Sequence, residues 1–342
     1  MHSEISSTRA PLAALLRTAL PSLQDAPPAA ALNQLVTSGL DRLPLPGHGA
    51  TLERWRALAT VGAHDLALAK LFEGHTDALA ILDEAGVHGG ADDALWATWC
   101  AEPPDARLAL SPDSHGELRL DGRKAWCSGA RDVTHAVVSC WDPDGAAMLA
   151  AVDLRQPGVT VTGDGWNAVG MANSGSVDVL FDGVQARVLG GPGFYVERAG
   201  FWHGGAGVAA CWFGAATHLA DALRERVAGR GDPHRLAQLG EVAVALQGSA
   251  ALMREAAARI DRTPQANAMA DALSARLSVE ASAGLVLRAA GRALGAGPLC
   301  KDAALARLYA DLPVFMRQSH AERDLEAVGR LVSESGASPW TL

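Results

Sequence analysis

The chain has 342 residues, of which 49% are hydrophobic and 20% are charged. Because a domain usually takes about 100–200 residues, this length predicts two or three domains rather than one simple core. The net charge of −9 and the scattered Lys and Arg residues exclude the basic surface that nucleic acid requires. No apolar run of membrane-spanning length occurs, and the segment MHSEISSTRA lacks the order of a signal peptide. We therefore expect a cytoplasmic protein that contacts neither nucleic acid nor membrane.

The remaining composition argues against metal and disulfide chemistry. The cysteines are widely spaced and include no CxxC pair, which favours buried reduced thiols. The histidines show no HExxH spacing, so the sequence predicts no metal site.

The first part of the chain has a helical pattern. Ala and Leu recur at helical spacing over residues 9–90, and the Pro-containing segments PSLQDAPP and LPLPGHG interrupt the pattern. These features predict an N-terminal helical domain over residues 1–92.

From about residue 96 the pattern alternates between apolar and polar residues. The run ELRLDGRKAWCSG holds Asp121-Gly122 between two strand-like halves, which predicts a tight hairpin. Four further runs read as short strands: VTHAVVSC, AAMLAAVDL, GVTVTG and SVDVLFDGV. Together they predict a middle antiparallel sheet or small barrel over residues 93–191.

The helical pattern then returns and continues through the rest of the chain. Four long helices are expected, near residues 197–229, 233–261, 266–294 and 302–333. Helices of this length form an antiparallel four-helix bundle, which we place in a C-terminal domain over residues 192–342. The fold class is therefore α+β and mostly α.

Two stretches of the β-region are similar to a known family: LDGRKAWCSGARDVTHAVVSC and GVTVTGDGWNAVGMANSGSVDVLFDGV. They resemble the acyl-CoA dehydrogenase family, and the matching positions are Trp126, Ser128, Trp166, Gly170, Met171, Ser174, Ser176 and Phe181. The resemblance implies the acyl-CoA dehydrogenase fold, with helices, a β-domain and a helical bundle in this order. It also implies a bound FAD.

The resemblance assigns Trp126 and Ser128 to the flavin. A flavin ring needs a flat apolar wall and hydrogen-bonding groups around its edge, and an indole and a hydroxyl meet that need. In the family's arrangement Trp126 packs on the isoalloxazine and Ser128 hydrogen-bonds near its reactive nitrogen and carbonyl. The alternative is that Trp126 belongs to the core of the β-domain and Ser128 to a turn.

A segment upstream, WCAEPPDARLAL, is similar to the family's loop around the flavin ring and pyrophosphate. The match is partial, because Ala101 replaces a Thr. The resemblance implies cofactor contacts from Trp99, Cys100, Ala101, Ala106 and Arg107. Arg107 either binds a phosphate or lies in solvent, and the sequence does not decide between these.

Two bundle segments, GRGDPHRLAQLGEV and ALGAGPL, resemble those that reach a neighbouring subunit's FAD in the family. The resemblance therefore adds Arg230, Gln238 and Gly295 to the cofactor site and implies a homodimer or homotetramer. Because Arg230 replaces the usual Phe and Val227 the usual Arg, FAD binding is expected to be looser or rearranged.

The family's usual catalytic Glu is missing from the C-terminal segment ADLPVFMRQSHAERD. The segment YVERAGFWHGGAGVAACWFG resembles instead the members that carry the base on the first bundle helix, which assigns the general base to Glu197. Its pKa is expected to rise through burial against the flavin, Phe201 and Trp202. The alternative is a Glu placed in a first helical turn by the helix dipole.

The leading interpretation is α,β-dehydrogenation of a CoA-bound or carrier-bound acyl thioester, with Glu197 as base and an electron acceptor such as an electron-transfer flavoprotein. His203 and His320 are further pocket candidates. Because the C-terminal segment carries His320 and lacks the Glu, the alternative is a flavin-dependent monooxygenase of the same fold. A third interpretation is a flavin-free binding protein.

Overall fold

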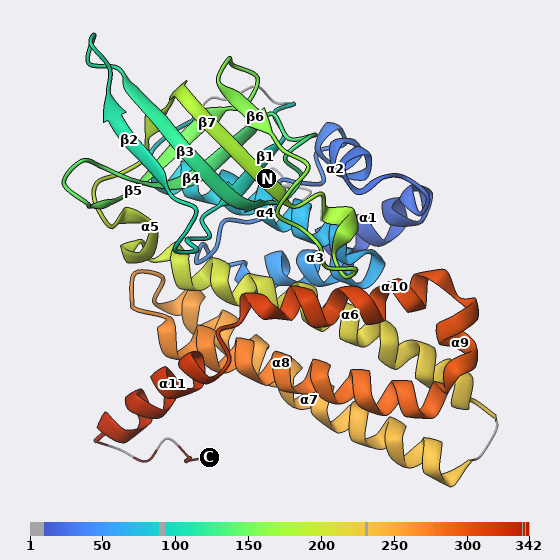
Figure 1. Cartoon of the computed structure of the whole chain (residues 1–342). Helices are drawn as coiled ribbons and strands as arrows, with labels where there is room; N and C mark the ends of the chain where they lie inside the picture. Colours follow the sequence, from blue (N-terminus) through green and yellow to red (C-terminus); the bar gives the residue numbers. More distant parts are fainter. Residues whose placement is uncertain (1–9, 89–92, 230–231, 337, 339, 342) are drawn as a thin grey trace, which may run out of the picture.

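The computed structural model describes residues 10–88, 93–229, 232–336, 338 and 340–341. Helices come first, a sheet follows, and long helices complete the chain (Figure 1). The sheet and the N-terminal helices form one half of the molecule, and the long C-terminal helices lie beneath them (Figure 1). This arrangement confirms the expected fold class.

The N-terminal helices pack around α4, whose middle is buried on all sides. Residues 66–69, 71–78 and 80–82 of this helix are buried, because β1 covers one side and α6 the other. Proline introduces η1 and α2, and the Asp65 carboxylate caps α4 by accepting from the Leu68 N–H. The elements are α1 (Leu12–Ala19), η1 (Leu20–Leu23), α2 (Pro28–Thr37), α3 (Thr51–His64) and α4 (Leu66–Glu84).

The sheet is mixed rather than purely antiparallel. Its strand order is β6-β7-β3-β2-β4-β5-β8, and β1 pairs with β4 beside this path. The β1–β4 and β2–β4 pairs are parallel, whereas the other described pairs are antiparallel. The strands are β1 (Trp96–Trp99), β2 (Leu108–Pro112), β3 (Leu118–Cys127), β4 (His135–Trp141), β5 (Ala147–Asp153), β6 (Val159–Val161), β7 (Val177–Gln185) and β8 (Arg187–Val188), with η2 (Ala172–Ser174) before β7.

The hairpin expected at Asp121-Gly122 is wrong, because β3 runs straight through both residues. The pairing of β3 with β7 is irregular between Leu120 and Gly122. Gly122 has φ +122°, and a Cβ there would lie 2.5 Å from the carbonyl oxygen of Arg107. This glycine therefore serves a bulge and a close backbone approach rather than a turn.

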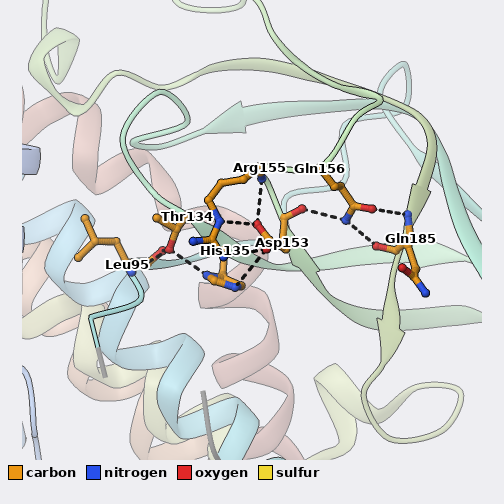
Figure 2. Close-up of polar contacts among 7 residues, drawn as sticks. All are labelled: Leu95, Thr134, His135, Asp153, Arg155, Gln156 and Gln185. Carbon is orange, nitrogen blue, oxygen red and sulfur yellow. Dashed lines mark hydrogen bonds and ion pairs between the residues drawn. The ribbon is translucent and has the colours of Figure 1, made fainter. Parts of the chain in front are cut away.

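Polar side chains join the ends of three strands at the side of the sheet shown in Figure 2. Nε2 of His135 lies 3.9 Å from Asp153, which also pairs with Arg155 at 2.8 Å. The Gln156 amide donates to the carbonyls of Asp153 and Gln185, both at 2.9 Å (Figure 2). Hydrogen bonds from Arg155 hold the pKa of Asp153 down at about 2. The network fixes the ends of β4, β5 and β7 relative to one another.

The bundle differs from the expectation in its last helix. The segment expected as one helix over residues 302–333 forms two, because Ser319 is extended and Ala321 has φ +45°. The elements are α5 (Phe194–Glu197), α6 (Gly200–Val227), α7 (Pro233–Arg262), α8 (Met269–Leu294), α9 (Ala296–Lys301), α10 (Ala303–Phe315), η3 (Met316–Gln318) and α11 (Glu322–Glu334).

Glycines allow α3 and α6 to pack at backbone contact. A Cβ on Gly62 would lie 2.3 Å from the Cys211 carbonyl oxygen, and one on Gly214 would lie 2.0 Å from that of Ala59. This contact fixes the axis of α6, whose first turns border the cavity described below.

By length and composition, α7 is the one described helix that could cross a membrane. Its residues Val242, Met253 and Ile260 are buried, and the helix packs against α8 and α6. A bundle helix passes the same test of composition.

Candidate functional site

A cavity of about 1290 Å³ lies between the sheet, α4 and the C-terminal helices. Residues from β1, the loop after it, β3, β4 and β5 form its sheet side, and residues from α4, α5, α6, α8, α10, η3 and α11 form its helical side. Small-molecule sites usually measure about 300–1,000 Å³. The cavity therefore has room for more than one small molecule.

Tryptophans form much of the cavity wall, and Trp126 has the most unusual conformation. Its φ of +58° is rare for a bulky residue, and it lies where the β3–β7 register shifts between Lys124 and Cys127. The bulge turns the indole outward, so Trp126 is 50% exposed while Ala125 and Cys127 are buried. The tryptophans on the cavity wall are Trp99, Trp126, Trp141, Trp166 and Trp202.

Three serine hydroxyls form a directed chain beside Trp126. Ser174 Oγ donates to the Met171 carbonyl at 2.7 Å, so its lone pairs accept from Ser176 Oγ at 2.8 Å. Ser176 then accepts from Ser128 Oγ at 2.9 Å. Because Ser128 donates its hydroxyl proton to Ser176, its oxygen can only accept a hydrogen bond from a ligand in the cavity. The Trp99 indole N–H fixes this residue by donating to its carbonyl at 3.1 Å.

A buried ion pair supports the loop that follows β1. Nζ of Lys124, fully buried, donates to Glu102 at 2.6 Å and to the carbonyl and hydroxyl oxygens of Ser139 at 3.0 and 2.7 Å. Glu102 also accepts from the Ser139 hydroxyl and from the Trp141 indole at 2.9 Å. Burial alone raises the pKa of Glu102, but these hydrogen bonds together hold it below its usual value. The pair holds Glu102 and Trp141 against the cavity.

A second charged group lies where α4 meets the start of α6. Arg198 donates to Glu84 at 2.8 Å and lies 3.9 Å from Asp77. Burial by itself lowers the pKa of Arg198, but Asp77 and Glu84 outweigh it and keep that pKa above its ordinary value. Burial raises the pKa of Asp77, against the opposing effect of Arg198. Asp77 and Arg198 both line the cavity, next to Tyr195 and Phe201.

Arg276 brings a buried cation to the cavity from α8. Its guanidinium donates to the carbonyls of Gly205 at 2.5 Å and Gln318 at 3.0 Å and lies over the Trp212 ring. No described carboxylate lies in ion-pair contact with it, and burial lowers the pKa of Arg276. The thiols of Cys100 and Cys140 also line the cavity, and burial raises the pKa of each to about 12, so both stay protonated.

The structure brings many of the sequence candidates together. The residues that line the cavity are Trp99, Cys100, Ala101, Trp126, Ser128, Phe201, Trp202 and His320. Ala106 is buried elsewhere. Arg107 does not line the cavity either, and its guanidinium lies 4.6 Å from the centroid of the Trp141 ring.

The burial expected for Glu197 is wrong. The residue is exposed and does not line the cavity. The reason is a helix boundary: Glu197 ends the four-residue helix α5, Arg198 is extended, and α6 begins only at Gly200. Arg198, its neighbour, takes the inward position that the spacing assigned to Glu197.

His203 also lies outside the cavity wall. Its ring is buried beside the loop before α3, where a Cβ on Gly47 would lie 3.2 Å from it. Burial lowers the pKa of His203. Neither Gln238 nor Gly295 lines the cavity of its own chain, and Arg230 lies outside the described residues. Contacts of these three residues with a neighbouring subunit stay a prediction.

Four residues that line the cavity were not predicted from the sequence: Asp77, Tyr195, Arg198 and Arg276. The helical spacing of α4 is typical of an ordinary core helix, but its centre, Glu73-Gly74-His75-Thr76-Asp77, is polar and buried. A run of polar residues in the middle of an otherwise apolar helix is the sequence feature that could have indicated a site here. His75 is part of this run, and its ring accepts the Trp96 N–H and contacts Asp41 at 3.1 Å.

No model of a known protein family matches the sequence. The amino sugar nitrososynthase DnmZ of Streptomyces peucetius is 40% identical over 114 residues, which cover 30% of this chain and 28% of DnmZ. A dibenzothiophene monooxygenase of Rhodococcus erythropolis is 32% identical over 182 residues, which cover 45% of this chain and 43% of that enzyme. The chain thus matches less than half the length of these relatives.

Among solved structures, the complex of TdsC from Paenibacillus sp. A11-2 with FMN and indole has a TM-score of 0.80 to this chain. The two are 20% identical, and the match covers 96% of each. At this identity the likeness establishes the fold alone. The fold expected from the sequence, that of the acyl-CoA dehydrogenases, is confirmed.

Proposed function

We propose that the protein is a flavin-dependent monooxygenase that oxygenates a nitrogen or sulfur atom of an organic substrate. One reduced FMN and one O2 are consumed in each turnover. One oxygen atom enters the substrate, the other leaves as water, and the flavin is released oxidised. This reading replaces the dehydrogenation of an acyl thioester.

The observation that carries the proposal is the wall formed by Trp126 and Ser128. Trp126 exposes half of a rigid aromatic side chain to a cavity that is large enough for a flavin and a substrate together. Its left-handed backbone stores strain of about 1–3 kcal/mol, and strain of this kind collects where a ligand binds. A flat ring packed on the indole would exclude water from that strained bulge.

The chain of hydrogen-bonded serine hydroxyls favours binding of reduced over oxidised flavin. Ser174 and Ser176 leave Ser128 as a hydrogen-bond acceptor toward the cavity. The reactive ring nitrogen carries a proton only in reduced flavin, so an accepting Ser128 favours that form. The bound flavin would supply the reducing electrons and the reaction with O2, and the chain would orient the ring and keep it dry.

The position of Glu197 argues against dehydrogenation. Removal of an α-proton needs a carboxylate within hydrogen-bond reach of the substrate, and Glu197 is exposed outside the cavity. Three carboxylates that do line the cavity, Glu73, Glu102 and Asp324, each lie 2.6–3.7 Å from a basic side chain.

The relatives support the choice of reaction and cofactor. One relative is named a nitrososynthase, and the other is named a monooxygenase of dibenzothiophene, a sulfur heterocycle. The solved neighbour binds FMN, whereas FAD was expected from the sequence. A separate flavin reductase then takes the place of the electron-transfer flavoprotein as the redox partner. The homo-oligomeric state and the cytoplasmic location remain expectations.

Labelled oxygen tests the proposal. The protein would be incubated with a free flavin reductase, NADH, FMN and ¹⁸O2, together with dibenzothiophene, indole and a set of amines. Mass spectrometry should find one ¹⁸O atom in at least one product, and Trp126→Ala should lower that yield by about tenfold or more. Trp340→Ala changes an indole that is 82% exposed and does not line the cavity, and should leave the yield unchanged.

Two results would reject the proposal. Oxidation of an acyl thioester by an artificial electron acceptor without O2 would restore the dehydrogenase interpretation. Failure of the protein to retain FMN or reduced FMN at all would favour the flavin-free binding protein.

A further inference from the structure

Asp77 stands apart from the other carboxylates on the cavity wall. Glu73, Glu102 and Asp324 each accept at least one hydrogen bond, from Lys70, Lys124 and the His320 N–H respectively. Asp77 accepts none from any residue that the structure describes, although the residue is only 8% exposed. Its Oδ1 is buried without a hydrogen-bond partner, and the nearest cation to this atom is Nη2 of Arg198 at 3.9 Å. A buried carboxylate that accepts no hydrogen bond is destabilising unless a ligand supplies a donor.

The surroundings keep Asp77 available. Its nearest cation, Arg198, is turned toward Glu84, with 2.8 Å to that carboxylate against 3.9 Å to Asp77. The Gly200 N–H also donates to Glu84, at 2.9 Å, which fixes this arrangement. Gly204 packs closely against Asp77, because a Cβ there would lie 2.8 Å from Oδ1, so a larger residue at this position would crowd the carboxylate.

The aromatic residues on the cavity wall indicate what the rest of the ligand is like. Phe201 lies edge-on to both Tyr195 and Trp202, with ring centroids 5.3 and 5.1 Å apart, and these rings line the same cavity. A ligand that satisfies this site therefore combines an apolar body with a group that donates hydrogen bonds to a carboxylate.

We propose that Asp77 binds the amino group of the substrate, and that the substrates are amines with an apolar body rather than sulfur heterocycles. The inference rests on the proposed function in taking this nitrogen as the atom that is oxygenated. Proton transfer from a bound ammonium to Asp77 breaks one N–H bond, forms one O–H bond and leaves the electron pair on nitrogen. Burial, which raises the pKa of Asp77, favours this transfer.

The test compares two probes of similar shape, 2-aminoindane and indane, by quenching of the cavity tryptophans. The wild type should bind the amine at least about tenfold more tightly than the hydrocarbon, as expected for a hydrogen bond to a charged group. Asp77→Asn should reduce this preference about tenfold, and Asp77→Leu should abolish it. Asp83→Asn makes the same change on the same helix at a half-exposed position outside the cavity, and should keep the preference.

The outcomes separate this inference from the proposed function. Equal binding of the two probes by the wild type, or an unchanged preference in both Asp77 variants, would overturn the amine site. Because the titration needs no flavin, it can succeed when FMN binding fails, which would refute only the proposed function. If one Asp77 variant fails to fold, the amine preference of the other variant, compared with that of the wild type, still tests the amine site.

Discussion

Removing the Lys124 ammonium should destabilise the protein and its cavity together. Lys124→Met keeps most of the side-chain volume but deletes three hydrogen bonds, to Glu102 at 2.6 Å and to two Ser139 oxygens at 2.7 and 3.0 Å. Lys124 is fully buried, so no water replaces it. The Glu102 carboxylate is left with the Ser139 hydroxyl, the Trp141 indole and the partly exposed Arg107 guanidinium at 3.9 Å.

The size of the effect follows from burial. Removing one partner of a buried ion pair costs about 3–5 kcal/mol. The Glu102 side chain is 26% exposed, so water recovers part of the lost interaction and about 3 kcal/mol is the better figure. For a chain of this length that loss should lower Tm by roughly 5–10 °C. The double variant Lys124→Met/Glu102→Gln also removes the charge that has lost its buried partner and should regain at least about 1 kcal/mol.

Thermal and urea unfolding, followed by near-ultraviolet circular dichroism, measure these differences. Lys124→Arg keeps the charge but adds bulk in a closed site, and should be intermediate. The free energy of unfolding of Lys124→Met could instead fall by less than about 1 kcal/mol, or the double variant could be less stable than the single one. Either result would show that the buried Lys124–Glu102 pair does not stabilise the fold as argued.

Three further changes test the fold and the site. Trp126→Gly should be about 1 kcal/mol more stable than Trp126→Ala in urea unfolding, because only glycine tolerates φ +58° without strain; the opposite order would mean that the bulge is unstrained. Gly62→Ala should cost at least about 1–3 kcal/mol because its Cβ would meet the Cys211 carbonyl at 2.3 Å, whereas Gly248→Ala, with open space around it, should stabilise α7 by about 0.5–1 kcal/mol. Equal effects of the two glycine variants would contradict the tight helix contact. The pKa of Glu102 is depressed in the folded state, so its contribution is present at neutral pH and lost as the pH falls below about 4.3. Glu102→Gln should therefore be less stable than the wild type at pH 7, and the gap should shrink in acid.

The sequence predicted residues of the wall that holds Trp126 and Ser128, but not the charged residues at the other end of the cavity. The resemblance of the motif around Trp126 and Ser128 to a known family singled out both residues, and the structure places both on the cavity wall. Asp77 lies in a helix whose periodicity indicates only that it is buried. Its contact with Arg198 joins residues far apart in the chain, and no local pattern predicts that contact.

Glu197 and the last helix show a second limit. Spacing along one helix assigned Glu197 to the interior, but a break of a few residues rotates Arg198 inward instead. The same kind of break divides α10 from α11, where Ser319 and Ala321 leave helical geometry. Single extended or left-handed residues depend on tertiary contacts, which helical periodicity does not record.

A titration with FMN and with photoreduced FMN tests the central claim most directly. We expect saturable quenching of the cavity tryptophans and tighter binding of the reduced form. Trp126→Leu should weaken the affinity by about tenfold or more. Ser128→Ala should remove most of the preference for the reduced form, while Trp340→Leu should bind as the wild type does. Absence of saturable binding, or affinities that neither Trp126→Leu nor Ser128→Ala changes, would contradict a flavin site at this wall.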